Sequence, residues 1–322
     1  MTIPVVVVAG FLGSGKTTML NHLLTSRTGT RIGVIVNDFG KVNIDAMTVA
    51  AQVDSMVTLG NGCLCCVVDV SDLDAMLDRL ATPDAPVDVI VIEASGLAEP
   101  PAMVRLVQGS TNPQVTYGGL VELVDAAEFE ATRLRHPQLD KHLRYADLVL
   151  LNKMDRAAPG VLDLVRELAD GVPVVPVEHG RVDPALLFEP VERPDHVGRQ
   201  LSFDDLVDHE PHIHATYETA TFTSAQPMNP TRFARFLTER PDGLYRMKGY
   251  VHFGDAERYS VQTVGTYVSV RPESETHDTQ LVLIGAGLDL DLITKTLADA
   301  VEPDPASVDP LELLSVTRYV RD

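Results

Sequence analysis

The sequence predicts an α/β protein: a doubly wound, mostly parallel sheet in the first half of the chain, followed by a smaller α+β domain. Short apolar runs rich in β-branched residues alternate with helix-like segments up to about residue 180, as in a parallel sheet with helical crossovers. The first run leads into a glycine-rich loop that opens a helix, which favours a ligand site at the sheet edge. Strand-like segments outnumber helical ones after about residue 215, as is typical of an antiparallel sheet.

The expected strands of the first half are short and nearly continuous in apolar residues, as strands covered on both faces require. Helical spacing of apolar residues, or a proline suited to a first turn, marks the segments between them. We expect strands at residues 3–9, 31–36, 55–59, 87–92, 115–124, 149–151 and 172–177, and helices at 16–26, 70–80, from Pro100 onward, 137–145 and 161–169.

A polar, proline-punctuated stretch divides the chain and reads as a linker. We therefore expect a first domain over residues 1–185, a linker over 186–214 and a second domain over 215–322. In the second domain we expect strands at 216–223, 245–253, 258–270 and 280–284, and helices at 230–239 and 289–300.

Composition limits the kinds of partner. The chain has 322 residues with 26 basic and 46 acidic side chains, a formal net charge of −20, which argues against nucleic acid or an anionic membrane as partner. No apolar stretch reaches membrane-spanning length, and the first apolar run lacks the basic region of a signal peptide. We expect a cytoplasmic protein, and the sequence does not specify its oligomeric state.

The glycine-rich loop has the spacing G-x-x-x-x-G-K-T of a phosphate-binding loop. Its glycines let backbone N–H groups turn toward phosphate oxygens, and the following helix directs its positive end at the same anion. Lys16 is suited to the β- and γ-phosphates, Thr17 to Mg²⁺, and Glu93, at the end of an apolar strand, to orienting Mg²⁺ and its waters. The expected phosphate-binding residues are Gly10, Gly13, Ser14, Gly15, Lys16, Thr17 and Thr18.

A second motif, Asn152-Lys153-Met154-Asp155, follows another apolar strand. A carboxylate at Asp155 can accept hydrogen bonds from two N–H donors of guanine, a donor pair that adenine lacks. Asn152 and Lys153 would brace the loop and cover the base. The sequence therefore predicts binding of GTP rather than ATP.

All three cysteines of the chain, Cys63, Cys65 and Cys66, lie within four residues. Thiolates at this spacing suit a soft metal ion such as Zn²⁺ and leave one tetrahedral position open. Asp38 is one candidate for the fourth ligand, and a histidine, water or a client protein are the others. A weaker cluster in the linker, His209, His212 and His214, could also bind metal.

Together these motifs resemble the CobW-like metallochaperone GTPases, a branch of P-loop proteins that includes the GTPases loading nickel into hydrogenase and urease. Stretches of the second half resemble that family's C-terminal domain. The residues that carry the resemblance are Gly10–Thr18, Asn37–Gly40, Gly62–Cys66, Glu93–Pro100, Asn152–Asp155, Arg232–Leu237, Gly243–Gly249 and Gln280–Gly285.

The resemblance implies a P-loop GTPase domain that couples slow GTP hydrolysis to delivery of Zn²⁺, or of Co²⁺ or Ni²⁺, to a metal-dependent client protein. It implies Lys16, Asp38 and Glu93 as catalytic residues, and metal ligation by Thr17, Glu93, Asp38 and the three cysteines. The chain departs from the family twice, with Asp38 where many members carry Glu, and with three histidines in place of a long tract.

Two other functions remain open from the residues alone. One is a regulatory or assembly GTPase in which zinc is only structural. The other is a small-molecule kinase that uses the same phosphate loop, although the Asn152–Asp155 motif argues against it. Metal affinity in different nucleotide states distinguishes the chaperone from the first, and GTP turnover without an added acceptor distinguishes it from the second.

Overall fold

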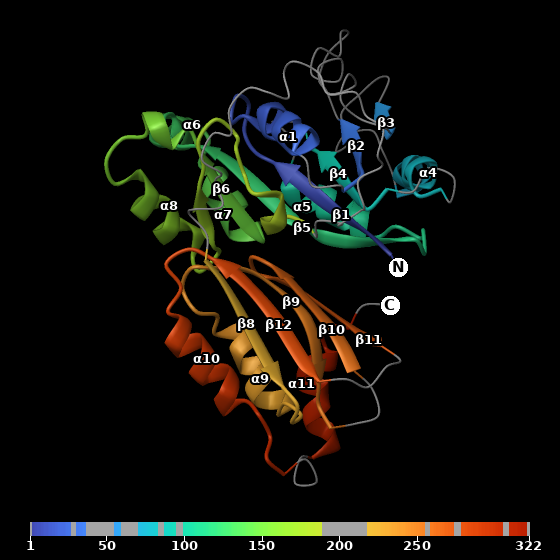
Figure 1. The fold of residues 1–322 in the computed structure, drawn as a ribbon. Helices are drawn as coiled ribbons and strands as arrows, with labels where there is room; N and C mark the ends of the chain where they lie inside the picture. The colour runs from blue at the N-terminus through green and yellow to red at the C-terminus, as the bar shows by residue number, and fades with distance from the viewer. Residues whose placement is uncertain are drawn as a thin grey trace, which may run out of the picture. The chain divides into compact units, whose positions relative to one another are not determined.

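The chain forms two compact units, Met1–Ala215 and Thr216–Asp322 (Figure 1). The computed structural model describes residues 2–26, 30–36, 55–58, 70–82, 87–94, 99–188, 218–254, 258–273, 278–304 and 309–320. The linker predicted over 186–214 lies almost wholly outside these ranges, so the predicted domain limits stay a prediction.

A seven-stranded sheet forms the centre of the first unit, with the strand order β3-β2-β4-β1-β5-β6-β7. Every pair of neighbouring strands is parallel, which confirms the predicted doubly wound sheet. The strands are β1 (Ile3–Ala9), β2 (Ile32–Val36), β3 (Ser55–Thr58), β4 (Val89–Glu93), β5 (Val115–Asp125), β6 (Leu148–Asn152) and β7 (Val174–Pro176).

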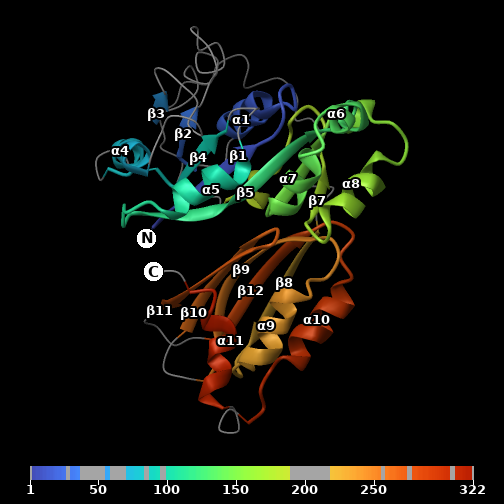
Figure 2. The same ribbon diagram turned by 180° about the vertical axis from the view of Figure 1, so that it is seen from behind.

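Helices cover both faces of this sheet (Figures 1 and 2). Right-handed crossovers between parallel strands place α1 on one face and α4, α5, α7 and α8 on the other, where α4 contacts α5, α5 contacts α7 and α7 contacts α8. The described helices are α1 (Lys16–Thr25), α4 (Val70–Leu80), α5 (Pro100–Gln108), α6 (Phe129–Arg135), α7 (Leu139–Tyr145) and α8 (Val161–Ala169), with short 3₁₀ turns η1 (Met154–Arg156) and η2 (Pro184–Leu186).

The central strands are buried because their side chains are apolar on both faces. Val5, Ile90 and Leu150, one each from β1, β4 and β6, have no exposed surface. Burying such a side chain contributes roughly 1.5–3 kcal/mol. The rigid core therefore fixes the carboxyl ends of the strands, from which the polar loops extend.

The strand order reverses direction beside β1. From β1 the chain goes to β2, toward one edge of the sheet. From β4 it goes past β1 to β5, toward the opposite edge. Ligands of open α/β sheets bind outside the carboxyl ends of the strands at such a reversal. The loop that follows β1 is the predicted phosphate loop, so the topology and the motif indicate the same place.

The second unit contains a five-stranded sheet of order β11-β10-β9-β12-β8, in which all neighbours are antiparallel. This confirms the predicted α+β domain. Its elements are β8 (Glu218–Ser224), α9 (Pro230–Thr238), β9 (Leu244–His252), β10 (Arg258–Val264), β11 (Tyr267–Glu273), β12 (Thr279–Gly285), α10 (Leu290–Asp299), η6 (Pro310–Leu313) and α11 (Leu314–Thr317).

Aromatic side chains are central to the core of this unit. The ring of Phe253 lies 5.7 Å from that of Phe233 on α9 and 5.6 Å from that of Tyr259 on β10, measured between centroids. Leu283 of β12 and Leu297 of α10 are fully buried in the same cluster. The helices thus pack on one face of the sheet (Figure 2).

Two sequence-based expectations were wrong. The single strand expected at 258–270 is a hairpin of β10 and β11, turned at Gly265 with φ +52°. In addition, α6 and the short α11 form helices where none was expected. Each has a single buried side chain, Phe129 and Val316 respectively, so both lack the apolar period by which helices are recognised.

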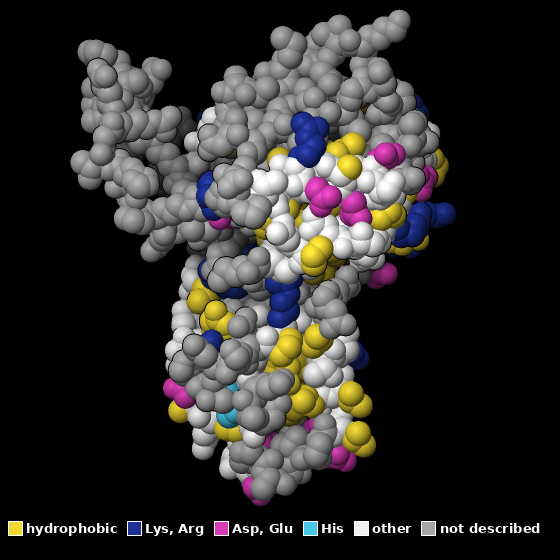
Figure 3. Space-filling model, turned by 90° about the vertical axis from the view of Figure 1, so that its right-hand side faces the viewer, with side chains coloured by type: hydrophobic (Ala, Val, Ile, Leu, Met, Phe, Trp, Pro, Cys, Tyr) yellow, Lys and Arg dark blue, Asp and Glu magenta, His cyan; other side chains and the backbone are white. Residues whose placement is uncertain are grey.

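Acidic, basic and hydrophobic side chains are interspersed on the face shown in Figure 3. Among the helices that the structure describes, none has both the length and the apolar character needed to cross a membrane.

Candidate nucleotide-binding site

The phosphate loop, residues 10–15, connects β1 to α1 and depends on two close approaches. Gly10 has φ +147° and Gly15 has φ +103°. A Cβ atom on Gly10 would collide with the carbonyl of Leu123, and one on Gly15 would collide with the side-chain amide of Asn152. Glycine is therefore required at both positions for packing as well as for backbone conformation.

Lys16 begins α1 and lies over this loop. Its Nζ atom donates to the carbonyl of Gly10 at 2.7 Å and to that of Phe11 at 3.3 Å, and the residue is only 8% exposed. The buried hydroxyl of Ser14 has no hydrogen-bond partner among the described residues. A phosphate would supply acceptors for both groups, so the loop fits an anion.

The predicted Mg²⁺ residues lie together at the sheet edge. Thr17 Oγ1 donates to Glu93 Oε1 at 3.4 Å, although the two residues are 76 positions apart. Glu93 ends β4 in register with Val8 of β1 and is 5% exposed. A hydroxyl and a carboxylate are hard oxygen ligands of the kind Mg²⁺ prefers, so these two residues fit the ion.

Asn152 connects the predicted base-binding loop to the phosphate loop. It ends β6 and is 2% exposed. Its Nδ2 atom donates to the carbonyl of Ser14 at 2.9 Å, and its Oδ1 atom accepts from the N–H of Gly180, also at 2.9 Å. One side chain thus joins three loops at the carboxyl edge of the sheet.

The next residues of this motif face a more open region. Lys153 has a left-handed φ of +62°, and its Nζ atom forms a 2.6 Å ion pair with Asp125 at the end of β5. Asp155 lies on η1 and is exposed. The exposed carboxylate of Asp155 is accessible to a base. Hydrogen bonds join Lys16 to Gly10, Thr17 to Glu93 and Asn152 to Ser14. Gly13 and Thr18 are exposed on the loop and on the first turn of α1.

Three residues near this site were missed from the sequence. Gly180, with φ +69°, passes so close to α1 that a Cβ atom would lie 2.9 Å from the backbone nitrogen of Met19. Asp125 pairs with Lys153 and could have been noted, since it ends an apolar strand as Glu93 does. Glu122 is an acid within the apolar run of β5, which is itself a signal.

Glu122 is 2% exposed, and burial raises the pKa of its carboxyl to about 8, against the opposing effect of the nearby Lys16 ammonium. The carboxyl is therefore mostly neutral at pH 7.

The predicted metal residues Cys63, Cys65, Cys66 and Asp38, together with the linker histidines 209, 212 and 214, lie outside the described residues. Their roles stay predictions.

Two family models cover most of the chain. Residues 4–174 match the nucleotide-binding domain described as CobW/HypB/UreG, and residues 217–301 match the C-terminal domain of the cobalamin synthesis protein cobW.

Similar proteins include two named zinc chaperones. The chain is 30% identical to "Zinc chaperone YjiA" of Escherichia coli over 309 residues, covering 89% of this chain and 95% of the relative. It is 29% identical to "Zinc chaperone CobW" of a Sinorhizobium species over 329 residues, covering 88% and 92%.

A third relative is "Zinc-regulated GTPase metalloprotein activator 1" of Dictyostelium discoideum, 41% identical over 111 residues that make up 30% of this chain and 23% of the relative. These matches confirm the resemblance based on the motifs. The chain belongs to the CobW/HypB/UreG family of nucleotide-binding proteins and carries the CobW C-terminal domain.

Proposed function

We propose that this protein is a GTP-hydrolysing metal chaperone. It binds Zn²⁺, or alternatively Co²⁺ or Ni²⁺, at Cys63, Cys65 and Cys66 and passes the ion to a metal-dependent client protein. Binding and hydrolysis of GTP control when the ion is held and when it is released.

The observation that supports the proposal most is the double hydrogen bond of Asn152, which joins the phosphate loop to the base-binding motif. A nucleotide bound across these loops has its phosphates at Lys16 and its base near Asp155. The chain is a P-loop GTPase: its guanine-type motif lies beside its phosphate loop, and its relatives include a named GTPase.

We assign the catalytic roles from residue type, supported by the positions of Lys16, Thr17 and Glu93. Lys16 stabilises negative charge that develops on the transferred phosphoryl group, because its ammonium is fixed at the loop. Thr17 and Glu93 would hold Mg²⁺, which would supply positive charge to offset that of the phosphates. We assign to Asp38 the orientation of the attacking water or a place in the metal site.

Support for metal handling comes from the cysteine motif and from the names of the relatives, two of which are zinc chaperones. Three thiolates give a site that is soft and that has one open position. An open position suits a carrier, because a client can enter the coordination sphere before the ion is released. We propose that Asp38, on the loop expected to respond to the γ-phosphate, occupies this position in one nucleotide state.

Titration with Zn²⁺ against a competing chelator tests this function in two nucleotide states. We expect one tight ion per chain, with affinities that differ between a non-hydrolysable GTP analogue and GDP, because coupling between two ligands is reciprocal. The affinity should fall at low pH, since binding requires thiolates and releases protons. Cys65→Ser and Cys66→Ser should each weaken binding strongly, because a hydroxyl is a poor ligand for soft metals.

Two results would contradict the proposal in different ways. Equal Zn²⁺ affinity in both nucleotide states would make zinc structural and favour a regulatory or assembly GTPase. Absence of Zn²⁺ binding would remove the chaperone and leave a GTPase. Asp163 is an exposed acid on α8, and Asp163→Asn serves as a control for altered surface charge. This variant should leave the Zn²⁺ affinity unchanged in both nucleotide states.

A further inference from the structure

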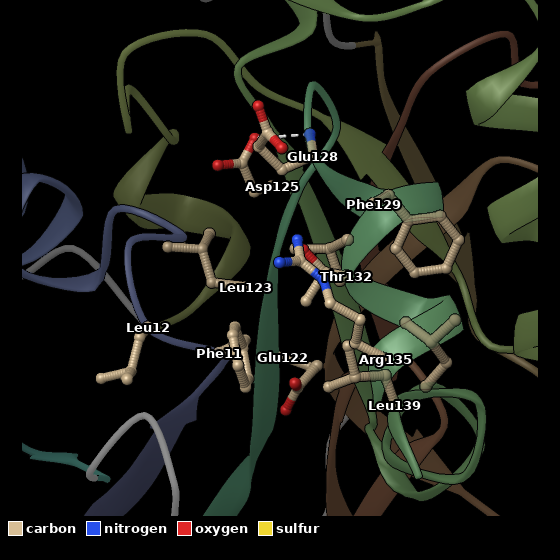
Figure 4. Close-up of a pocket in the computed structure, with 12 residues that line it drawn as sticks. Phe11, Leu12, Glu122, Leu123, Asp125, Glu128, Phe129, Thr132, Arg135 and Leu139 are labelled. Atoms are coloured by element: carbon tan, nitrogen blue, oxygen red, sulfur yellow. Dashed lines mark hydrogen bonds between the residues drawn. The ribbon is translucent and has the colours of Figure 1, made fainter. Parts of the chain in front are cut away.

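A cavity of about 210 Å³ lies beside the phosphate loop, between Phe11 and Leu12 on one side and α6 and α7 on the other (Figure 4). Its walls are partly apolar and partly polar and come from the phosphate loop, β5, α6 and α7. Besides Phe11 and Leu12, the lining residues that matter below are Glu122, Glu128, Phe129, Thr132, Arg135 and Leu143. None of the described residues predicted to contact the nucleotide lines this cavity.

Glu122 is the polar group at its most buried wall. The residue is 2% exposed, and its Oε2 atom has no hydrogen-bond partner among the described residues. A buried carboxyl without a partner is unfavourable by roughly 1–3 kcal/mol. A ligand that donates a hydrogen bond to the Glu122 carboxyl group would offset that penalty.

The charges around Glu122 come from several elements. Lys16 of α1 acts on its carboxyl through space, and Arg135 and Glu128 line the same cavity near its exposed part. Asp125 is paired with Lys153. His136 packs its ring on Phe11, with centroids 4.6 Å apart.

Arg135 lines the cavity but does not supply the cation for the Glu122 carboxyl. Its Nε atom donates to the carbonyl of Ala131 in its own helix, and the residue is exposed. Figure 4 shows its guanidinium near Leu123 and Thr132, whereas the Glu122 carboxyl lies by Phe11. Since exposed charges are screened by water, Arg135 weakens a cation site only modestly.

We propose that this cavity binds an organic cation on an apolar stem, an alkylguanidinium or alkylammonium group, with the cation on Glu122 and the stem along Phe11, Phe129 and Leu143. The apolar walls accommodate the stem, and the buried carboxylate supplies a charge-assisted hydrogen bond, the stronger kind. The volume corresponds to one long side chain or a molecule of similar size, being somewhat larger than a cavity that holds benzene.

The neighbouring nucleotide favours a cation over an anion. Phe11 and Leu12 belong to the phosphate loop and also line the cavity, so any ligand lies close to the expected phosphates. An anion there would be repelled by the nucleotide, whereas a cation would be attracted by both the phosphates and Glu122. The cation and the nucleotide should therefore strengthen each other's binding.

Calorimetric titration with n-butylguanidinium tests the site on the full-length protein without nucleotide, so its result does not depend on GTP hydrolysis. We expect Glu122→Gln to weaken binding roughly ten- to a hundredfold, because the amide cannot form a charged hydrogen bond. Glu130→Gln is the matched control, an exposed acid on α6 that does not line the cavity, and should change affinity by less than about threefold. Unchanged affinity in Glu122→Gln, or no binding to the unsubstituted protein, would overturn the proposal.

Proton release distinguishes this site from simple apolar binding. A Glu122 carboxyl with a pKa of about 8 must lose its proton to pair with a cation, so binding at pH 7 should release nearly one proton per ligand, measured by titration in buffers of different ionisation enthalpy. Release that is absent, or that persists in Glu122→Gln, would contradict the proposal.

A second variant and a second probe complete the test. Thr132→Phe should narrow the cavity and weaken binding while leaving Glu122 in place. This variant keeps the test valid if Glu122→Gln is unstable. Unweakened binding by Thr132→Phe would mean that the ligand binds elsewhere and would refute the site. N-acetylarginine amide distinguishes the source: binding comparable with n-butylguanidinium indicates that a protein side chain can supply the cation, and weaker binding indicates a free small molecule.

Discussion

Lys16 is the single residue on which hydrolysis should depend most. Its ammonium is fixed on the phosphate loop by the carbonyls of Gly10 and Phe11. Lys16→Ala removes the cation that faces the developing phosphate charge, so we expect GTP turnover to fall about a hundredfold or more. The control is Lys141→Ala, an exposed lysine on α7, which should keep normal turnover. Normal turnover in Lys16→Ala would assign the charge stabilisation to another group.

Asp155 should determine the choice of base. The carboxylate is exposed on η1 and available to the two N–H donors of guanine. Asp155→Asn replaces one acceptor oxygen by a donor, and the preference for GTP over inosine triphosphate should fall roughly tenfold or more. Competition binding of the two nucleotides measures it. An unchanged preference would contradict the assignment of this loop.

Glu122 should make stability depend on pH in the direction opposite to an acid whose pKa is lowered by folding. Its pKa is raised from 4.5 to about 8 in the folded protein. Between these values the unfolded chain loses the proton and the folded chain keeps it, so the free energy of unfolding falls as pH rises through this window and levels off above pH 8. The total is on the order of a few kcal/mol.

Urea denaturation across that pH range, comparing the unsubstituted protein with Glu122→Gln, measures this effect. The variant should show a smaller decline, because glutamine does not titrate. If the free energy of unfolding changed with pH in the same way for both proteins, the pKa of the Glu122 carboxyl would not be raised by folding. Glu128→Gln, an exposed acid, should follow the unsubstituted curve.

Among the elements, the loop after β7 depends on one glycine. A Cβ atom on Gly180 would lie 2.9 Å from the backbone nitrogen of Met19, whereas one on Gly171 would meet nothing within 4 Å. Both have positive φ, +69° and +89°, so alanine is strained at either position. Gly180→Ala should cost about 1 kcal/mol or more beyond Gly171→Ala, measured by urea denaturation, and should also weaken nucleotide binding through Asn152. Equal costs would show that the loop moves away freely.

The strands were predictable because their signal is local. The run Val5–Val8 and the run Val89–Ile92 are continuous in β-branched residues, which only a buried strand accommodates well. The hairpin at Gly265 was not found because apolar residues alternate on both sides of the turn, so 258–270 resembled one long strand. Helix α6 was missed because Phe129 alone is buried.

The site was predictable where motif and topology agree. Lys16 and Thr17 were proposed from the phosphate-loop motif at the start of α1, and Glu93 from its position at the end of β4. The hydrogen bond that the Gly180 N–H donates to Asn152 depends on packing between segments that are distant in sequence. The burial of Glu122 depends on such packing as well. No local pattern specifies which loops meet, so such contacts require the structure.

At the scale of the whole molecule, each unit has its own core and the described nucleotide residues all belong to the first. The cluster around Phe233, Phe253 and Tyr259 consists only of residues from the second unit. A domain with its own core can fold alone. We therefore expect a fragment of residues 1–215 to bind and hydrolyse GTP at close to the rate of the full chain.

A fragment of residues 216–322 should in turn unfold cooperatively, because its five-stranded sheet is covered by its own helices. Circular dichroism during heating measures this transition, and a GTP turnover assay measures the first fragment. Phe233→Ala in the second fragment should lower its melting temperature markedly, since removing a fully buried phenylalanine costs roughly 3–5 kcal/mol. If the second fragment is folded but the first hydrolyses GTP only when both are mixed, the C-terminal domain contributes to the nucleotide site, and the chemistry is not confined to the first unit.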